Sequence, residues 1–250
     1  MKFIPENMAE LATHPQFFTW MEPQRMMFEM AGLTVSTPLI VPLHTADGHP
    51  VLVVTGLWGN NVSTLPLRTA LKLIGHQVYT PPAFAMQRTP RKIVQILAKE
   101  VDELHAKHDD QVSLIGWSVG GAFTRMAAFQ TPNHVRQVIN LGAPLDGWWY
   151  PQDRKYAAGP LPVPSTVVYS RTDGCMEWRR VIQHTGPQAE NIEVISSHYG
   201  MANNPMTLHV VADRLAQPKG VWAPYAGLVL SDLVPNQFLR SFDQNGPHAA

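Results

Sequence analysis

The sequence predicts a single α/β domain in which helices cover both faces of a mostly parallel sheet. Short apolar, β-branched runs alternate with amphipathic segments of helical period along most of the chain. Such alternation is typical of parallel strands that are joined by crossover helices. The chain has 250 residues, which suits one domain with a sizeable core. Several apolar runs end in loops with glycine or polar residues, as expected at the ligand-binding edge of such a sheet.

Composition and charge narrow the classes of partner. The chain has 19 Lys and Arg and 19 Asp and Glu, so its formal net charge is zero. Nucleic acid and anionic surfaces are therefore not expected as main partners, because no net field would attract them. The single cysteine, Cys175, leaves no internal disulfide and fits a reducing compartment. No secretory signal pattern is found and no run approaches ~20 apolar residues, so we expect a cytoplasmic protein without a membrane span.

Residues 1–50 are expected to form an extension before the sheet. Prolines interrupt this Met- and Phe-rich stretch, so short helical pieces are expected, of which residues 24–31 form the clearest. The three methionines of that piece are more typical of a core than of an acyl-binding wall. Prolines also limit a possible edge strand at residues 39–43.

The remaining elements follow from hydrophobic period and from turn residues. Residues 50–55 form a continuous apolar, β-branched run, as a strand buried on both faces should. It stops at the glycine-bounded loop 56–61. Gly75 is expected to end the first helix as a C′ glycine. The elements expected after residue 55 are helices at 63–74, 91–107 and 119–129, and strands at 77–80, 112–115, 135–141, 165–170 and 191–195.

The strand at residues 112–115 leads into the pattern G-x-S-x-G, at residues 116–120. A serine hydroxyl is a poor nucleophile unless it is held clear of the backbone, beside a base. A tight strand-to-helix turn does this for Ser118, and Gly116 and Gly120 lack a Cβ where strand and helix would collide. The pattern alone is weak evidence, because a chain of this length shows it by chance about once in ten. The strand before it and the small-residue helix after it favour a nucleophile elbow.

A carboxylate and a histidine follow the last two predicted strands. Asp173 lies in the turn after residues 165–170, and His198 lies in the loop after residues 191–195. The carboxyl ends of parallel strands meet at one edge of a sheet, so both side chains should meet Ser118 there. The chain order Ser, Asp, His is that of one known arrangement of the catalytic triad.

Other residues could take two of these roles. Asp146 also follows a strand and is an alternative acid. His184 and His209 are the histidines nearest to His198, but both fall in helix-like segments. Cys175 could be a nucleophile, although it lacks an elbow and is more typical of a small buried residue. The histidines at 105 and 108 are spaced like a metal pair but lack a third ligand type nearby, so no metal is expected.

Residues 142–164 lack periodicity and are rich in proline and aromatic residues. A connection of this length is expected to be functional, as a short lid or rim over the site.

The backbone N–H of Leu57 is expected to bind a developing oxyanion, with Trp58 as the adjacent possibility. The apolar side chains in loops or turns that should border the site, and bind an uncharged acyl substrate, are Trp58, Trp117, Phe84, Met86, Trp148 and Trp149.

These motifs resemble those of the α/β-hydrolase superfamily, on its lipase and esterase side. The resemblance rests on residues 50–82, the elbow IGWSVGG, the acid turn SRTDG and the segment SHYGMANNP. It implies ester hydrolysis with Ser118 as nucleophile, His198 as base and Asp173 as the acid that orients it. It further implies oxyanion donors at Leu57 and Val119, and no metal or organic cofactor.

Three functions stay open at this point. The first is hydrolysis of carboxylic esters through an acyl-enzyme. The second uses the same triad for acyl transfer to an alcohol or for cleavage of a thioester, since nothing in the sequence separates these acceptors. The third is a binding protein with a silent hydrolase fold, which the presence of all three triad residues disfavours.

Overall fold

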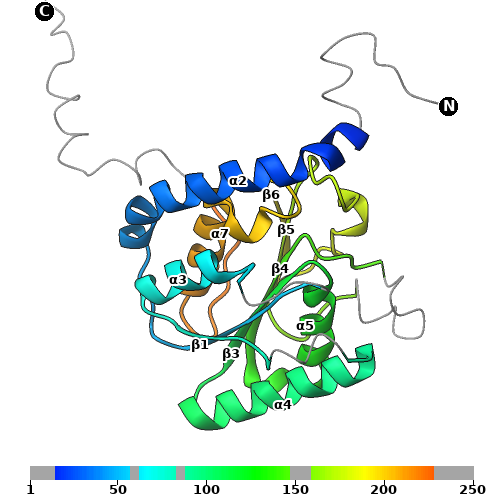
Figure 1. The fold of residues 1–250 in the computed structure, drawn as a ribbon. Coiled ribbons are helices and arrows are strands. Elements are labelled where there is room, and N and C mark those ends of the chain that lie inside the picture. The colour runs from blue at the N-terminus through cyan, green and yellow to red at the C-terminus, as the bar shows by residue number, and fades with distance from the viewer. Residues whose placement is uncertain (1–14, 57–61, 83–87, 147–158, 228–250) are drawn as a thin grey trace, which may run out of the picture.

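The computed structural model describes residues 15–56, 62–82, 88–146 and 159–227 (Figure 1). Its centre is a six-stranded sheet of order β2-β1-β3-β4-β5-β6, in which every neighbouring pair is parallel. The predicted parallel sheet is therefore confirmed. The strands are β1 (Pro50–Val54), β2 (Gln77–Tyr79), β3 (Val112–Trp117), β4 (Val135–Leu141), β5 (Ser165–Tyr169) and β6 (Ala189–Glu193).

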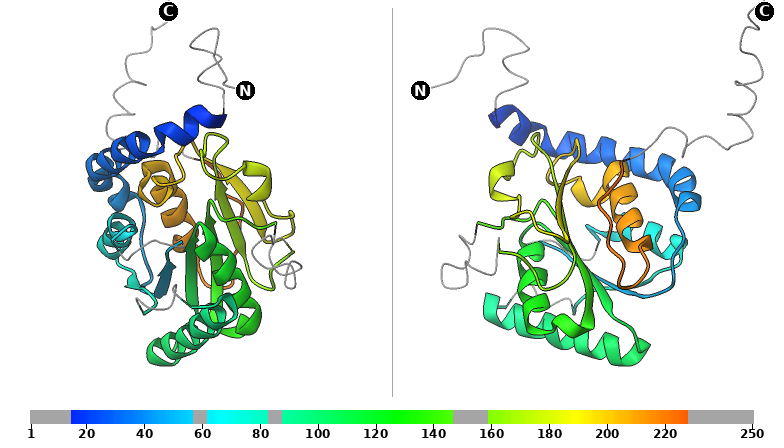
Figure 2. Two further views of the ribbon diagram at one scale, coloured as in Figure 1. Left: turned by 45° about the vertical axis from the view of Figure 1, so that its right-hand side comes forward. Right: turned by 180° about the vertical axis from the view of Figure 1, so that it is seen from behind.

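Helices lie on both faces of the sheet, as Figures 1 and 2 show. One face carries α3 (Leu65–Ile74) and α7 (Pro205–Ala216), and the other carries α4 (Pro90–His108) and α5 (Val119–Gln130). Side chains of β1 alternate between the two cores: Val51 and Val53 pack with α3 and α7, while Leu52 and Val54 pack with α4 and α5. A strand buried on both faces needs this continuous apolar sequence.

Element boundaries agree closely with the sequence, with two local differences. Helix α3 starts at Leu65 rather than at residue 63; the side chain of Thr64 before it makes no capping bond, and a proline occupies its first turn. This helix ends at Gly75, which has a φ of 118°, as the C′ position requires. Strand β6 ends at Glu193, so Ile195 lies beyond it and is exposed. Short 3-10 helices occupy Pro132–His134, Trp178–Arg180 and Met201–Asn203.

The N-terminal part differs most from expectation. Instead of short pieces, residues Pro15–Ile40 form one helix, α2, which runs through Pro23 and packs across α7 at the end of the sheet (Figure 1). The expected edge strand at 39–43 is wrong: these residues form the end of α2 and a 3-10 helix, η1 (Val41–Leu43). An interior proline costs roughly 3 kcal/mol. Burial of Leu33 and Ile40 in the core offsets part of this cost.

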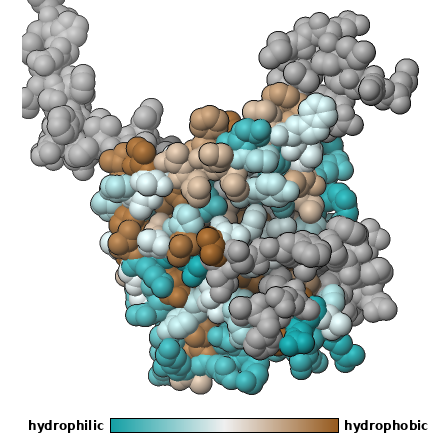
Figure 3. Space-filling view, in the orientation of Figure 1, coloured by the Kyte–Doolittle hydropathy of each residue, from teal (hydrophilic) through white to brown (hydrophobic). Residues whose placement is uncertain are grey.

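The outer face of α2 carries no charge among its described side chains. Its three charged residues, Glu22, Arg25 and Glu29, all bond toward the protein body. Trp20, Met27, Phe28, Val35 and Leu39 are among its exposed residues, and Figure 3 shows apolar surface along this edge. The segment Phe17–Leu43 has the length and mean hydropathy, 1.4, of a membrane span. Length and composition alone do not place a helix in a membrane, so the absence of a membrane span stays a prediction.

Candidate active site

A strained serine joins β3 to α5. Ser118 has φ 54° and ψ −138°, a backbone conformation that is rare outside glycine. A Cβ on Gly116 would lie 2.3 Å from the Cα of Gly121, and one on Gly120 would lie 2.3 Å from the carbonyl oxygen of Thr55. Both elbow glycines are thus required by close backbone approach. The Ser118 N–H donates to the Leu141 carbonyl oxygen at 2.8 Å, which ties the turn to β4.

The structure brings the three predicted triad residues together. The Ser118 Oγ lies 3.0 Å from the Nε2 of His198, and the Nδ1 of His198 lies 2.8 Å from the Oδ2 of Asp173. These residues follow β3, β6 and β5, so they meet at the carboxyl edge of the sheet, as the sequence predicts. The side chains of Asp173 and His198 are only 2% and 6% exposed. Electrostatic interactions between buried groups are weakly screened by water, which suits charge stabilisation.

The orientation of the Asp173 carboxylate is fixed by the backbone that follows it. Its Oδ1 accepts hydrogen bonds from the N–H groups of Cys175 and Met176, at 2.8 and 2.7 Å. Its Oδ2 is left to accept from the Nδ1–H of His198. With a proton on Nδ1, the Nε2 of the imidazole presents a lone pair to Ser118. This is the tautomer that a general base needs.

An oxyanion site can be built beside Ser118 from two loops. Val119 is the first residue of α5, so its N–H is among those that have no partner within the helix. On the other side, a Cβ on Gly56 would lie 2.9 Å from the Cβ of Ser118, so the loop after β1 starts directly against the serine. Leu57 and Trp58 lie outside the described residues. The Leu57 donor therefore stays a prediction.

Most of the predicted substrate contacts are not described. Phe84, Met86, Trp148 and Trp149 lie outside the described residues, as does residue range 147–158 of the expected lid. Trp117 is described, but the structure does not support its assignment as a substrate contact. As the last residue of β3, its side chain turns into the core and is 9% exposed. Its Nε1 donates to the carbonyl oxygen of His198 at 3.0 Å, so it supports the loop of the base.

The alternative acid and bases have other partners. The Oδ2 of Asp146 accepts from the Nε of Arg180 at 2.6 Å. His209 is buried in α7, where its Nδ1 lies 3.1 Å from the Nε2 of His44. His184 is exposed in the loop before β6. The pairing of Asp173 with His198 is thus the arrangement that reaches Ser118.

Cys175 is unsuited to act as the nucleophile. The residue is exposed, not buried as the sequence suggests, but partial desolvation of the thiol, together with the nearby carboxylates of Glu22 and Asp173, raises its pKa to about 12. The thiolate is the reactive form of cysteine, and it is scarce near neutral pH at such a pKa. The thiol side chain is also held beside the acid rather than beside the base. The alternative of a cysteine nucleophile therefore finds no support.

Two groups of side chains in the described residues are close enough to hold a metal ion. In the first, Glu22, Asp173 and Cys175, the carboxylate oxygens already accept hydrogen bonds from backbone N–H groups or from the triad histidine. The second is Asp47, His49 and His76, which precede β1 and β2 and so lie at the opposite edge of the sheet from Ser118. There Asp47 already pairs with Arg136 at 2.7 Å. A metal-free reaction stays a prediction.

Comparison with known proteins gives the fold a name. No protein-family model and no curated protein sequence matches the chain. Among solved structures, Aspergillus fumigatus lipase B superposes with a TM-score of 0.58 over 70% of this chain, at 16% identity. This chain has the α/β-hydrolase fold. It covers 54% of that lipase, about half of its length.

Two further lipases share this α/β-hydrolase fold. Paleococcus ferrophilus monoacylglycerol lipase has a TM-score of 0.54 and 14% identity, over 69% of this chain and 96% of its own. Bacillus licheniformis lipase BlEst2 has a TM-score of 0.53 and 14% identity, over 70% of this chain and 95% of its own. At such identities the likeness establishes the fold alone, so the activity must be argued from the site.

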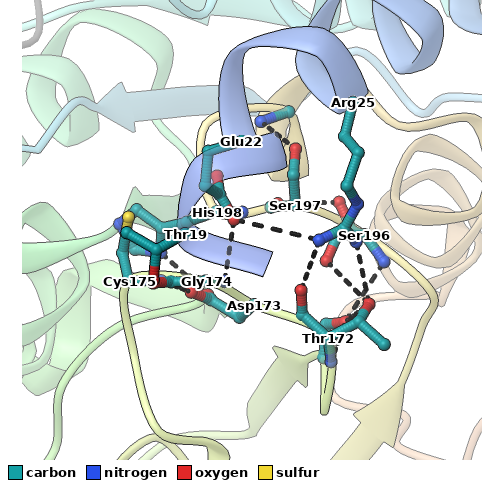
Figure 4. Close-up of polar contacts among 12 residues, drawn as sticks. Thr19, Glu22, Arg25, Thr172, Asp173, Gly174, Cys175, Ser196, Ser197 and His198 are labelled. Carbon is teal, nitrogen blue, oxygen red and sulfur yellow. Dashed lines mark hydrogen bonds and ion pairs between the residues drawn. The ribbon is translucent and has the colours of Figure 1, made fainter. Parts of the chain in front are cut away.

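Sequence reasoning missed one component of the site in this hydrolase fold, the helix α2. Glu22 reaches from α2 into both loops that carry Asp173 and His198 (Figure 4), whereas Glu29 bonds to Ser197, outside the triad. A signal was present, since Glu22 and Glu29 are the only acidic residues of a helix rich in apolar side chains. It could be read only after residues 15–40 had been recognised as one continuous helix.

Proposed function

We propose that the protein is a serine hydrolase that cleaves uncharged carboxylic esters through an acyl-enzyme. One observation carries the proposal: Ser118, His198 and Asp173 form a continuous chain of hydrogen bonds, with distances of 3.0 and 2.8 Å, on a strained elbow of an α/β-hydrolase fold. Hydrogen-bonded nucleophile, base and orienting acid are the parts that nucleophilic acyl transfer requires.

The reaction follows from this geometry. The Oγ of Ser118 attacks the acyl carbonyl carbon while the Nε2 of His198 takes the hydroxyl proton. Asp173 holds the imidazole tautomer and stabilises the imidazolium that forms. The N–H of Val119, with a second donor predicted at Leu57, binds the oxyanion, and each such donor contributes about 3 kcal/mol in the transition state. His198 then protonates the leaving alcohol, and a water molecule activated by the same base releases the acid.

Hydrolysis of p-nitrophenyl esters from acetate to decanoate tests the proposal, with Ser118→Ala as the control. We expect turnover by the wild-type protein alone, and a kcat/KM that rises over the first few methylenes, since each buried CH₂ contributes about 0.8 kcal/mol. Equal activity in folded Ser118→Ala would refute the proposal. Added alcohols and acyl thioesters in the same assay separate hydrolysis from acyl transfer and from thioester cleavage, since each gives a different product.

A further inference from the structure

We propose that Glu22 of α2 is a positioning residue. It holds the loop that carries Asp173 and the loop that carries His198 in a fixed position relative to each other. This inference rests on the proposed function, because it assigns Glu22 a task in that same reaction. The Oε1 of Glu22 accepts the N–H groups of Gly174 and His198 at 2.8 and 2.9 Å, and its Oε2 accepts the N–H of Tyr199 at 2.9 Å (Figure 4). One carboxylate thus bridges the residue after Asp173 and the base itself.

These contacts account for a buried charge. The Glu22 side chain is 1% exposed, and a buried carboxylate is costly unless it is hydrogen-bonded. Its nearest basic group, Arg25, keeps a distance of 4.0 Å from Oε1 and uses its guanidinium to donate to Thr172. The three backbone N–H donors are therefore the main compensation. Hydrogen bonds to an ionised acceptor are roughly twice as strong as neutral ones.

The base residue is anchored at both polar groups of its own backbone. Glu22 accepts a hydrogen bond from the N–H of His198, and the indole of Trp117 donates to the carbonyl oxygen of His198 at 3.0 Å. Trp117 is adjacent to Ser118 in the elbow. The backbone of the base is thus fixed between α2 and the nucleophile. A shift of about 1 Å in a reacting group can cost about 10²-fold in rate.

The turn after the acid is anchored in the same way. Glu22 accepts a hydrogen bond from the N–H of Gly174, and the Oγ1 of Thr19 donates to the carbonyl oxygen of Gly174 at 2.5 Å. The contact is close, since a Cβ on Gly174 would lie 2.5 Å from the backbone carbon of Phe18. Because side chains of α2 are hydrogen-bonded to both loops, a change at Glu22 should alter the distance between Asp173 and His198. It should also alter the distance between His198 and Ser118.

Glu29 offers a matched control on the same helix. Its Oε1 accepts the N–H of Ser197 at 2.7 Å, and its Oε2 lies 2.6 Å from the Ser197 hydroxyl oxygen. Burial raises the pKa of Glu29. A glutamine can keep both contacts there, because its amide oxygen accepts the N–H and its NH₂ group donates to the hydroxyl. At Glu22 three N–H groups converge on two oxygens, so the NH₂ group of a glutamine must face an N–H.

The test measures kcat and KM for p-nitrophenyl acetate in full-length Glu22→Gln, Glu29→Gln and wild type. Rates are expressed per active site, counted by the final extent of labelling with a fluorophosphonate. We expect Glu22→Gln to lower kcat per labelled site by about 10²-fold or more with KM within about threefold, as misplaced catalytic groups should. Glu29→Gln should lower kcat by less than about threefold. Glu22→Asp, which keeps the charge one methylene short, should fall between wild type and Glu22→Gln.

Each outcome separates the two proposals. If Glu22→Gln lowers the number of labelled sites but not kcat per site, Glu22 has a structural role only and the positioning role is overturned. An equal loss of kcat in Glu29→Gln also overturns the positioning role, because any disturbance of α2 would then be enough to lower kcat. If Glu22→Gln does not fold, a normal kcat per site in Glu22→Asp likewise overturns the positioning role. A wild type that is neither labelled nor active instead refutes the proposed function.

Discussion

Replacing Asp173 by asparagine tests the acid of the triad. The change should act by moving one proton on the imidazole of His198. The Oδ1 of Asp173 accepts two backbone N–H groups, from Cys175 and Met176, so the oxygen of an asparagine will occupy that position. The NH₂ group then faces the Nδ1 of His198, where the Oδ2 lies 2.8 Å away in the native protein. A donor at Nδ1 forces the imidazole proton onto Nε2. That nitrogen can no longer accept the proton of Ser118.

The structure indicates how large the loss should be. Rotating the amide to restore the native tautomer would turn its NH₂ group toward two backbone donors, at about 1 to 3 kcal/mol for each group left unsatisfied. The inactive tautomer is therefore strongly favoured. We predict that Asp173→Asn lowers kcat by on the order of 10⁴, as the same change does in a serine protease triad. This corresponds to about 5 kcal/mol of transition-state stabilisation.

Steady-state hydrolysis of p-nitrophenyl acetate measures the effect, with circular dichroism as a check on folding. Asp146→Asn is the matched control, because Asp146 also follows a strand but pairs with Arg180 rather than with a histidine. Its kcat should stay within about threefold of wild type, since a half-exposed ion pair contributes about 1 kcal/mol or less to stability. Near-normal activity in folded Asp173→Asn, or a larger loss in Asp146→Asn, contradicts the assignment of the acid.

Three further predictions use groups outside the triad. Gly116→Ala should lower the melting temperature or prevent folding, because a Cβ would lie 2.3 Å from the Cα of Gly121 and overpacking costs about 1 to 3 kcal/mol; an unchanged melting curve counts against the elbow geometry. Iodoacetamide should leave activity intact at pH 8, because the Cys175 pKa is raised to about 12; rapid inactivation would contradict this. Burial lowers the pKa of His76 to about 4, below its value in the unfolded chain. The unfolded chain therefore binds a proton first, and the free energy of unfolding falls by on the order of 3 kcal/mol as the pH falls from about 6.5 to 4. Urea unfolding of His76→Leu should show a weaker pH dependence than wild type over that range, and equal slopes would refute the assignment.

The sequence is sufficient to predict the sheet and the meeting of Ser118, Asp173 and His198 at one edge of it, because both depend on local pattern. Each buried strand is a continuous apolar run, and the strand predicted at residues 135–141 has the bounds that β4 has. Asp173 and His198 can be placed because loops after parallel strands share one edge. Local pattern cannot show which way a strand residue points near its end. The sequence therefore assigns Trp117 to the substrate, although its side chain supports the base from the core.

The role of α2 could not be predicted because its stability and its contacts are not local. Pro23 indicates a break, but the helix continues because it packs on α7 and because Glu22 binds loops more than 150 residues away in the chain. No sequence period reveals such contacts. Through these contacts residues 15–40 pack directly against the domain that contains the sheet.

Covalent labelling tests the central claim most directly. A fluorophosphonate reacts with a serine only where a base and an oxyanion site activate it, so the site of the adduct identifies the nucleophile. Mass spectrometry of the labelled and digested protein should show one adduct per chain, on Ser118, with esterase activity lost in proportion, and none in Ser118→Ala. An adduct on another residue, or a folded wild-type protein that hydrolyses esters without being labelled, would contradict the account.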